Sequence, residues 1–330
     1  MKPTLALLSA GGTITAVGSD RLDLASYLEN QSAVEPGGLL SAVPEASALA
    51  EVREIPCPKI VSHALTDADW LRLRHQIAEL LDDQGVDGVV VTHGTNTLEE
   101  TAYFLSLTLP ARKPVVLVGA MRPASALSAD GPLNLLNAIR VAAAPESAGC
   151  GVLVTMNDAI FSPRDLTKGA TYRVNAFGSP DLGPLGYADA DGKVLYYHRS
   201  ERPLGDVPAF SPKGSSLPRV DVVVSYVGAD ETMVNAAVAA GAAGIVSAAT
   251  GAGRPTPREL AALRRASALG VVVCQSSRVA GGRVVRTKTT TEAGFVAADN
   301  LGPFKARVLL SLALTETKEP EKIQGMFDRY

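Results

Sequence analysis

Two threonines that could act as nucleophiles lie in glycine-rich turns of this chain. Thr13 follows Gly11 and Gly12 at the end of an apolar run, and Thr95 follows Gly94 at the end of another. A threonine hydroxyl is a weak nucleophile at neutral pH, and it needs a neighbouring base to take its proton. Glycines let the backbone approach a bound ligand closely. The turns therefore favour nucleophilic chemistry, although each turn alone is also typical of a tight turn with a capping threonine.

The elements that must position these threonines alternate between strand and helix. Short apolar runs predict buried strands at residues 5–9, 88–92, 115–118 and 151–156, and helical spacing predicts helices at 66–85, 98–107 and 133–144. This order is typical of a doubly wound, mostly parallel sheet of the flavodoxin-like kind, whose sites lie at the carboxyl ends of the strands. Both threonines are then expected at one sheet edge, where the helix after Thr97 offers free N–H groups to an oxyanion.

The length of 330 residues predicts two domains, since one domain averages roughly 150 residues. Residues 201–219 are rich in Pro, Gly and Ser and carry no periodic pattern, so we expect them to form a linker. They divide a larger N-terminal catalytic α/β domain (1–200) from a smaller C-terminal α/β domain (220–330). Within the smaller domain, the sequence predicts strands at 221–227, 244–247 and 271–274 and helices beginning at 257, 303 and 321.

Composition and charge exclude several classes of partner. With 31 Lys and Arg against 34 Asp and Glu, the net charge of −3 is unsuited to a nucleic-acid-binding protein. The uncharged stretch 232–253 is rich in Ala and Gly, which favours a helix and a buried strand over a membrane span. The apolar run after Lys2 is too short for a signal peptide, and Cys57, Cys150 and Cys274 are scattered. We therefore expect a cytoplasmic protein with free thiols.

Motifs for nucleotide cofactors and for serine hydrolases are incomplete in this chain. Gly251 and Gly253 continue into Arg254 and Pro255 without the third glycine of a dinucleotide-binding loop, and the P-loop and GxSxG patterns are missing. The four histidines do not have the spacing of metal ligands; they are His63, His75, His93 and His198. These patterns therefore imply neither a nucleotide cofactor nor a metal site.

Seven segments, in order along nearly the whole chain, carry a family resemblance. They are 10–14 (AGGTI), 93–97 (HGTNT), 99–104 (EETAYF), 119–123 (GAMRP), 129–134 (ADGPLN), 164–168 (RDLTK) and 305–310 (KARVLL). Together they resemble the bacterial-type L-asparaginases. The resemblance implies hydrolysis of a small-molecule amide without a cofactor, and a homotetramer built as a dimer of dimers.

The resemblance also implies catalytic roles for four residues. Thr13 is similar to the family's nucleophile, which forms an acyl-enzyme and releases ammonia before water frees the acid. Thr95 and Lys168 match the family's second threonine and its lysine, which together polarise a hydroxyl or a water molecule. A lysine serves as a base only when burial lowers its pKa. Tyr27 is the expected counterpart of a lid tyrosine that orients the nucleophile.

Substrate-binding positions are where this chain departs from the family pattern. Ser62 and Ala120 occupy positions that the family uses for substrate contacts. The family has aspartate where this chain has Asn96, and commonly glutamine where it has His63. Glu292 is the candidate for a glutamate that a neighbouring subunit lends to the site. Because Asn96 lacks a charge, we expect weaker or different recognition of the substrate's α-ammonium and easier proton loss from Lys168.

Three functions stay open from the sequence. L-Asparagine hydrolysis through an acyl-threonine is the leading interpretation. The second is a related ω-amidase that acts on a carboxylate-bearing amide lacking a free α-ammonium. The third is a non-catalytic amino-acid sensor on the same scaffold, and the joint presence of Thr13, Thr95 and Lys168 counts against it, because binding alone needs no lysine base.

Overall fold

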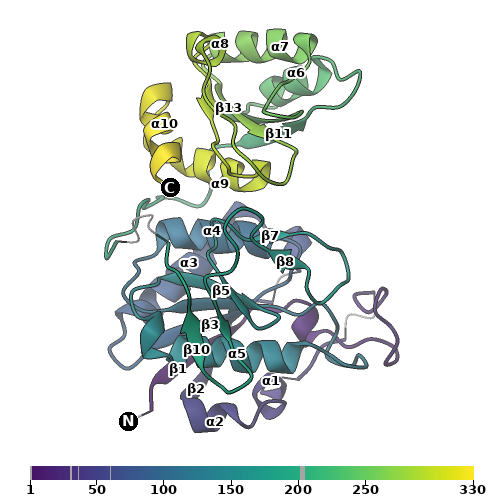
Figure 1. The fold of residues 1–330 in the computed structure, drawn as a ribbon, viewed down its shortest axis with the longest axis vertical. Helices are drawn as coiled ribbons and strands as arrows, with labels where there is room; N and C mark the ends of the chain where they lie inside the picture. The colour runs from purple at the N-terminus through teal and green to yellow at the C-terminus, as the bar shows by residue number, and fades with distance from the viewer. Residues whose placement is uncertain (1, 30–31, 36, 60, 201–204) are drawn as a thin grey trace. The chain divides into compact units, whose positions relative to one another are not determined.

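The computed structural model describes residues 2–29, 32–35, 37–59, 61–200 and 205–330, and these form two compact units, Met1–Ala209 and Phe210–Tyr330 (Figure 1). The elements of the first unit are β1 (Thr4–Ser9), α1 (Gly38–Ser41), α2 (Ala46–Leu49), β2 (Glu51–Ile55), α3 (Asp67–Asp82), β3 (Gly88–Thr92), α4 (Leu98–Thr108), β4 (Val115–Val118), α5 (Gly131–Ala143), β5 (Val152–Met156), β6 (Ala159–Phe161), β7 (Thr167–Lys168), β8 (Phe177–Gly178), β9 (Gly186–Ala188) and β10 (Val194–Tyr196). Three 3₁₀ turns join them, η1 (Thr13–Thr15), η2 (Ser62–Ala64) and η3 (Pro145–Ser147).

One eight-stranded sheet organises the first unit, in the order β10-β9-β6-β5-β4-β3-β1-β2. The strands β2, β1, β3, β4 and β5 are parallel, and β6, β9 and β10 add an antiparallel extension. The order 2-1-3-4-5 is the flavodoxin-like one, whose switch point lies between β1 and β3. The prediction of a doubly wound, mostly parallel sheet is confirmed, and Thr13 and Thr95 follow the two strands at that switch point.

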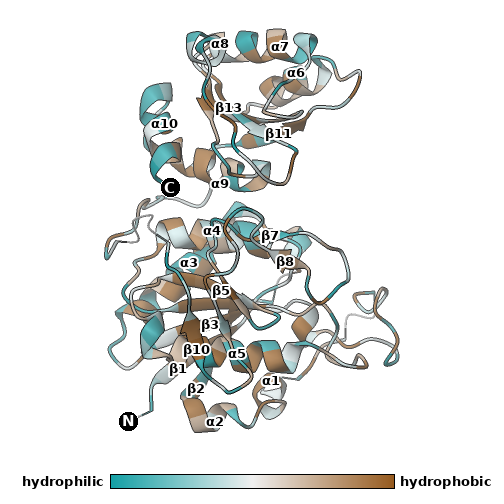
Figure 2. Ribbon diagram, viewed as in Figure 1, coloured by the Kyte–Doolittle hydropathy of each residue, from teal (hydrophilic) through white to brown (hydrophobic). Residues whose placement is uncertain are grey.

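Helices cover both faces of this sheet because its strands are apolar on both faces (Figure 2). On one face, Leu5, Leu7 and Val90 pack in a core with Leu135 and Ile139 of α5. The alternate strand residues are also fully buried and point to the other face. There, α3 and α4 contact each other, and the ring of Trp70 stacks on Phe104 with centroids 5.1 Å apart.

Local capping fixes where α3 begins. The Thr66 hydroxyl accepts a hydrogen bond from the Asp69 N–H, and the Asp69 carboxylate accepts one from the Thr66 N–H, which forms a capping box. Trp70 then donates from its indole nitrogen to the Thr101 hydroxyl of α4 at 2.9 Å. The predicted helix over residues 66–85 is confirmed as Asp67–Asp82.

The second unit is a smaller four-stranded parallel sheet in the order β11-β12-β13-β14. Its elements are β11 (Val220–Val224), α6 (Thr232–Ala239), β12 (Gly244–Ala249), α7 (Pro257–Ala268), β13 (Val272–Ser277), α8 (Lys288–Glu292), β14 (Val296–Ala297), α9 (Pro303–Ala313) and α10 (Pro320–Arg329). The uncharged stretch 232–253 is a helix followed by a buried strand, as predicted. In the part of the chain that the structure describes, no helix is long and apolar enough to cross a membrane.

The short elements differ most from the sequence prediction. The strand predicted at 221–227 ends at Val224, and Val227 is almost fully exposed. The sequence analysis did not predict β7 and β8, which have two residues each, and no periodic pattern can be read from so few positions. This small hairpin matters for function because Lys168 is the last residue of β7.

Candidate active site

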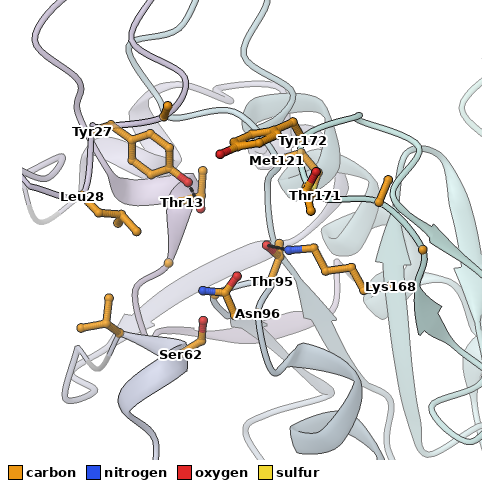
Figure 3. A pocket seen from close by; sticks show the side chains of 16 residues that line it. Thr13, Tyr27, Leu28, Ser62, Thr95, Asn96, Met121, Lys168, Thr171 and Tyr172 are labelled. Carbon is orange, nitrogen blue, oxygen red and sulfur yellow. Dashed lines mark hydrogen bonds between the residues drawn. The ribbon is translucent and has the colours of Figure 1, made fainter. Parts of the chain in front are cut away.

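A pocket of about 550 Å³ opens in the first unit beside the carboxyl ends of β1 and β3 (Figure 3). Backbone glycines and side chains from six separated segments of the chain line it: Gly12, Thr13, Ala25, Tyr27, Leu28, Val61, Ser62, Gly94, Thr95, Asn96, Met121, Lys168, Gly169, Ala170, Thr171 and Tyr172. Of the residues predicted for the site, the pocket brings together Thr13, Tyr27, Ser62, Thr95, Asn96 and Lys168.

Direct backbone contact holds the two threonine turns together. A Cβ on Gly12 would lie 2.6 Å from the Gly94 Cα and 2.8 Å from the His93 carbonyl carbon, which no real side chain allows. Gly12 also has φ +98°, a conformation that favours glycine. A Cβ on Gly119, after β4, would lie 2.9 Å from the Thr95 Cγ2. Because glycines occupy these positions, three neighbouring turns can meet around one pocket.

Thr13 is hydrogen-bonded to a tyrosine from the loop after η1. The hydroxyls of Thr13 and Tyr27 are 2.9 Å apart, and either one can donate. Thr13 is 8% exposed and lines the pocket from a largely buried turn. Figure 3 shows the Tyr27 ring reaching over Thr13 at one side of the pocket. A phenolic oxygen at this distance can orient the threonine hydroxyl and take part in moving its proton.

Thr95 is hydrogen-bonded to the lysine of the β7–β8 hairpin. The Lys168 Nζ donates to the Thr95 Oγ1 at 2.9 Å. Burial lowers the pKa of Lys168 from its usual value, and the negative charge of Glu99 in the first turn of α4 partly opposes that change. A lower pKa makes the neutral amine more accessible near neutral pH, and the neutral amine is the form that can accept a proton.

A carboxylate and an amide hold the turn after β4 in place. The Asp130 carboxylate accepts hydrogen bonds from the N–H groups of Met121 and Arg122, both at 2.9 Å. Asn134 donates to the Gly119 carbonyl and to the Asp130 carboxylate, both at 3.1 Å. The segment 129–134 thus fixes the backbone that packs against Thr95 and carries Met121 to the pocket.

His93 is buried next to Gly94 in the chain and is neutral. Burial lowers its pKa to about 4, and its Nδ1 is 2.7 Å from the Gly94 carbonyl. Because a carbonyl oxygen only accepts, Nδ1 carries the proton and donates it. The ring therefore supports the turn before Thr95.

The other predicted site residues lie elsewhere. His63 is exposed next to Ser62 and does not line the pocket. Ala120 is fully buried, whereas its neighbour Met121 lines the pocket. Glu292 lies in the second unit at the end of α8, exposed, with a carboxylate oxygen 3.9 Å from the Lys288 Nζ.

Sequence reasoning did not single out several residues of this region. Leu28 and Val61 line the pocket with exposed apolar side chains, and Tyr172 lines it from the segment after Lys168. These residues lie in irregular segments without periodicity, so no sequence signal marks them. Glu99 belongs to the segment 99–104 that carries the family resemblance, and its charge acts on Lys168. Among the described residues, no three His, Cys, Asp or Glu side chains group together as a metal site would require.

Comparison with known proteins identifies relatives over the full length of the chain. Residues 4–202 match the family model "Asparaginase, N-terminal", and residues 219–327 match "Glutaminase/Asparaginase C-terminal domain". The chain is 44% identical to a probable periplasmic L-asparaginase of Haemophilus influenzae and 43% identical to L-asparaginase 2 of Escherichia coli strain K12. Each alignment covers 99% of this chain and 93% of the relative.

A solved structure agrees with these sequence matches. The crystal structure of a probable cytoplasmic L-asparaginase from Campylobacter jejuni superimposes with a TM-score of 0.95 at 42% identity, over 100% of both chains. The resemblance read from the seven sequence segments is therefore confirmed, as is the two-domain α/β fold.

Proposed function

The chain belongs to the asparaginase/glutaminase family of amidohydrolases, and from this premise we propose that it hydrolyses the side-chain amide of L-asparagine to L-aspartate and ammonia through an acyl-threonine. The observation that carries the proposal is the pair of hydrogen-bonded threonines, Thr13 with Tyr27 and Thr95 with Lys168, facing one pocket.

In the first half-reaction, the Thr13 oxygen attacks the amide carbon. A bond forms between the Thr13 Oγ1 and that carbon, the carbon–nitrogen bond breaks, and the leaving nitrogen takes a proton to depart as ammonia. The Tyr27 hydroxyl, 2.9 Å from Thr13, orients the nucleophile, and the proton that Thr13 loses passes to the leaving nitrogen. The N–H groups at the start of α4 lie next to Thr95 and Asn96, where they can stabilise an oxyanion.

In the second half-reaction, water takes the place of the leaving group. Neutral Lys168 accepts a proton through Thr95, which lets a water molecule attack the acyl carbon, break its bond to the Thr13 oxygen and return the proton to Thr13. The lowered pKa of Lys168 supports this role because it increases the neutral fraction at a given pH.

The decisive experiment traps the acyl-enzyme on its residue. Rapid quenching with L-asparagine, followed by mass spectrometry of peptides, is expected to place an aspartyl adduct on Thr13. The Thr13→Val variant keeps the shape of the side chain and is expected to lose on the order of 10⁴-fold in kcat. Thr250→Val in the second unit is the matched control and is expected to keep its activity. An adduct on Thr95 in place of Thr13 would contradict the assignment.

We propose a homotetramer, a dimer of dimers, as the assembly. Besides the family resemblance, Val224, Tyr226 and Val227 at the end of β11 are exposed, Val227 to 99%, and an apolar patch of this kind favours contact with another protein surface. Light scattering during gel filtration is expected to give four copies of the 34.2-kDa chain.

A cytoplasmic location is part of the same proposal. The three free thiols of Cys57, Cys150 and Cys274 suit a reducing compartment, whereas one relative in the comparison is named periplasmic. Fractionation of cells that express the native gene tests the proposal.

A further inference from the structure

The pocket has a neutral, partly apolar wall opposite its lysine. Figure 3 shows Lys168 at one side, Leu28 and Ser62 at the other, and Asn96 between them. Leu28 is 41% exposed and Val61, next to Ser62, is 46% exposed, and both line the pocket. Ala25 is a third apolar residue among those that line the pocket. This wall is suited to an uncharged group with some hydrocarbon.

The polar groups on this wall are neutral as well. Asn96 is exposed to the pocket, and its amide offers both a carbonyl acceptor and an NH₂ donor. Ser62 contributes a hydroxyl. Lys168 is the charged side chain among the described lining residues, and its charge is positive when it is protonated.

A free amino acid brings an ammonium group that this wall does not match. Hydrogen bonds from an ammonium to a carboxylate are roughly twice as strong as neutral ones, and a cation beside Lys168 is also repelled by it. An acylated nitrogen carries no charge. Its N–H and its carbonyl can pair with the carbonyl and the NH₂ of the Asn96 amide, and its acyl carbons can lie against Leu28 and Val61.

We propose that the enzyme prefers carboxylate-bearing primary amides whose α-nitrogen is uncharged, with Nα-acyl asparagine as the best-fitting class. This inference rests on the proposed function and on the same Thr13 chemistry. The side-chain carbon–nitrogen bond breaks, water supplies the hydroxyl of the new carboxylate, ammonia leaves, and the Nα–acyl bond stays intact. Asn96 and Ser62 bind the uncharged nitrogen substituent, and Leu28 and Val61 bind the acyl carbons.

The test compares three substrates through ammonia release at one pH: L-asparagine, Nα-acetyl-L-asparagine and succinamic acid, which has no α-nitrogen. We expect kcat/KM for the acetylated substrate to exceed that for L-asparagine. An equal or smaller value for the acetylated substrate, with L-asparagine turned over, overturns the inference and leaves the proposed function standing. Ammonia release from none of the three overturns the proposed function itself.

Two variants assign the preference to particular residues. Asn96→Asp supplies a carboxylate for an ammonium, so the ratio of kcat/KM for the acetylated substrate to that for L-asparagine is expected to fall at least tenfold. The matched control Asn235→Asp, on an exposed face of α6, is expected to leave this ratio unchanged. Leu28→Ala is expected to lower kcat/KM for the acetylated substrate and to leave succinamic acid unaffected, because only the former has an acyl group. An unchanged ratio in both Asn96→Asp and Leu28→Ala contradicts the assignment.

Discussion

Both parallel sheets of this molecule have a threonine beside a glycine where a strand ends, yet the two turns differ in what their hydroxyls contact. In the first unit, Thr95 follows β3 and lies in the pocket beside Lys168. In the second unit, Thr250 follows β12 and precedes Gly251, but its hydroxyl donates to the Arg254 carbonyl at 2.8 Å within the same turn. One hydroxyl faces a pocket and the other stabilises its own loop.

Gly12, in the other threonine turn of the first unit, differs from Gly251 in the same way. A Cβ on Gly12 would overlap the backbone of Gly94, whereas a Cβ on Gly251 would meet no atom of the described residues within 4 Å. Gly12 is therefore required by a neighbouring turn. Gly251 is favoured by its own left-handed φ of +52°.

This difference shows which feature marks a candidate site. A threonine that donates to a nearby carbonyl acts as a turn stabiliser, because its hydrogen-bonding capacity is used locally. Thr13 and Thr95 instead pair with Tyr27 and Lys168, which are 14 and 73 residues away along the chain. A turn becomes a reactive site when distant polar partners and a second turn converge on it.

The test with the largest expected effect removes the Lys168 amine, which is hydrogen-bonded to Thr95. Lys168→Met keeps the length of the side chain but cannot accept a proton, so kcat is expected to fall by about 10²- to 10⁴-fold with a smaller change in KM. Steady-state kinetics with circular dichroism measures this. Lys193→Met, a change at an exposed lysine paired with Asp191, is the control and should keep full activity. A fall of less than tenfold in Lys168→Met would remove the distinction between Thr95 and Thr250.

The second test exchanges the two glycines for alanine. Gly12→Ala is expected to lower the free energy of unfolding by about 2–5 kcal/mol, because both overlap with backbone and a strained φ contribute. Gly251→Ala is expected to cost only about 1–2 kcal/mol, from φ alone. Denaturant unfolding of both variants measures the difference. Equal losses would show that contact between the turns does not distinguish the two regions.

The third test removes the Tyr27 hydroxyl, which is hydrogen-bonded to Thr13 in the first turn. Tyr27→Phe keeps the ring and breaks the hydrogen bond to Thr13, so kcat/KM is expected to fall about two- to tenfold, the equivalent of one net hydrogen bond. Tyr187→Phe, at an exposed ring of β9, provides the matched control. If Tyr27→Phe were as active as the control, Thr13 would be oriented by its own turn, as Thr250 is.

The sequence predicts the strands and the helix starts because their signals are local. The run 88–92 centres on three consecutive valines and forms β3 with the same bounds, and the two members of the Thr66–Asp69 capping box are three positions apart. The pairing of Lys168 with Thr95 has no such signal, since it depends on the two-residue strands β7 and β8. Family resemblance named the site residues, whereas physical reasoning from spacing reached only the two threonine turns.

The wall of the pocket could not be predicted for the same reason. Leu28 and Val61 lie in irregular segments, and their exposed side chains share a pocket only after the chain has folded. The effect of Glu99 on Lys168 also depends on α4 and the β7–β8 hairpin being brought together. Such contacts between distant segments are decided by tertiary packing.

The smallest expected effect tests the charge around Lys168. Glu99 raises the pKa of Lys168 by favouring its ammonium form, so Glu99→Gln is expected to lower that pKa further. Because the neutral amine is the active form, the rising limb of kcat/KM against pH should then move to lower pH. At a pH below the midpoint of that limb, the variant should be faster than the parent enzyme. Glu100→Gln, in the same helical turn, is the control and should leave the limb in place. Added salt should reduce the shift of the limb between Glu99→Gln and the parent, because screening weakens the field of Glu99. If instead activity fell as Lys168 lost its proton, and that falling limb moved to lower pH in Glu99→Gln, the ammonium form of Lys168 would be the active one, and the lysine would then stabilise charge at Thr95 without accepting its proton.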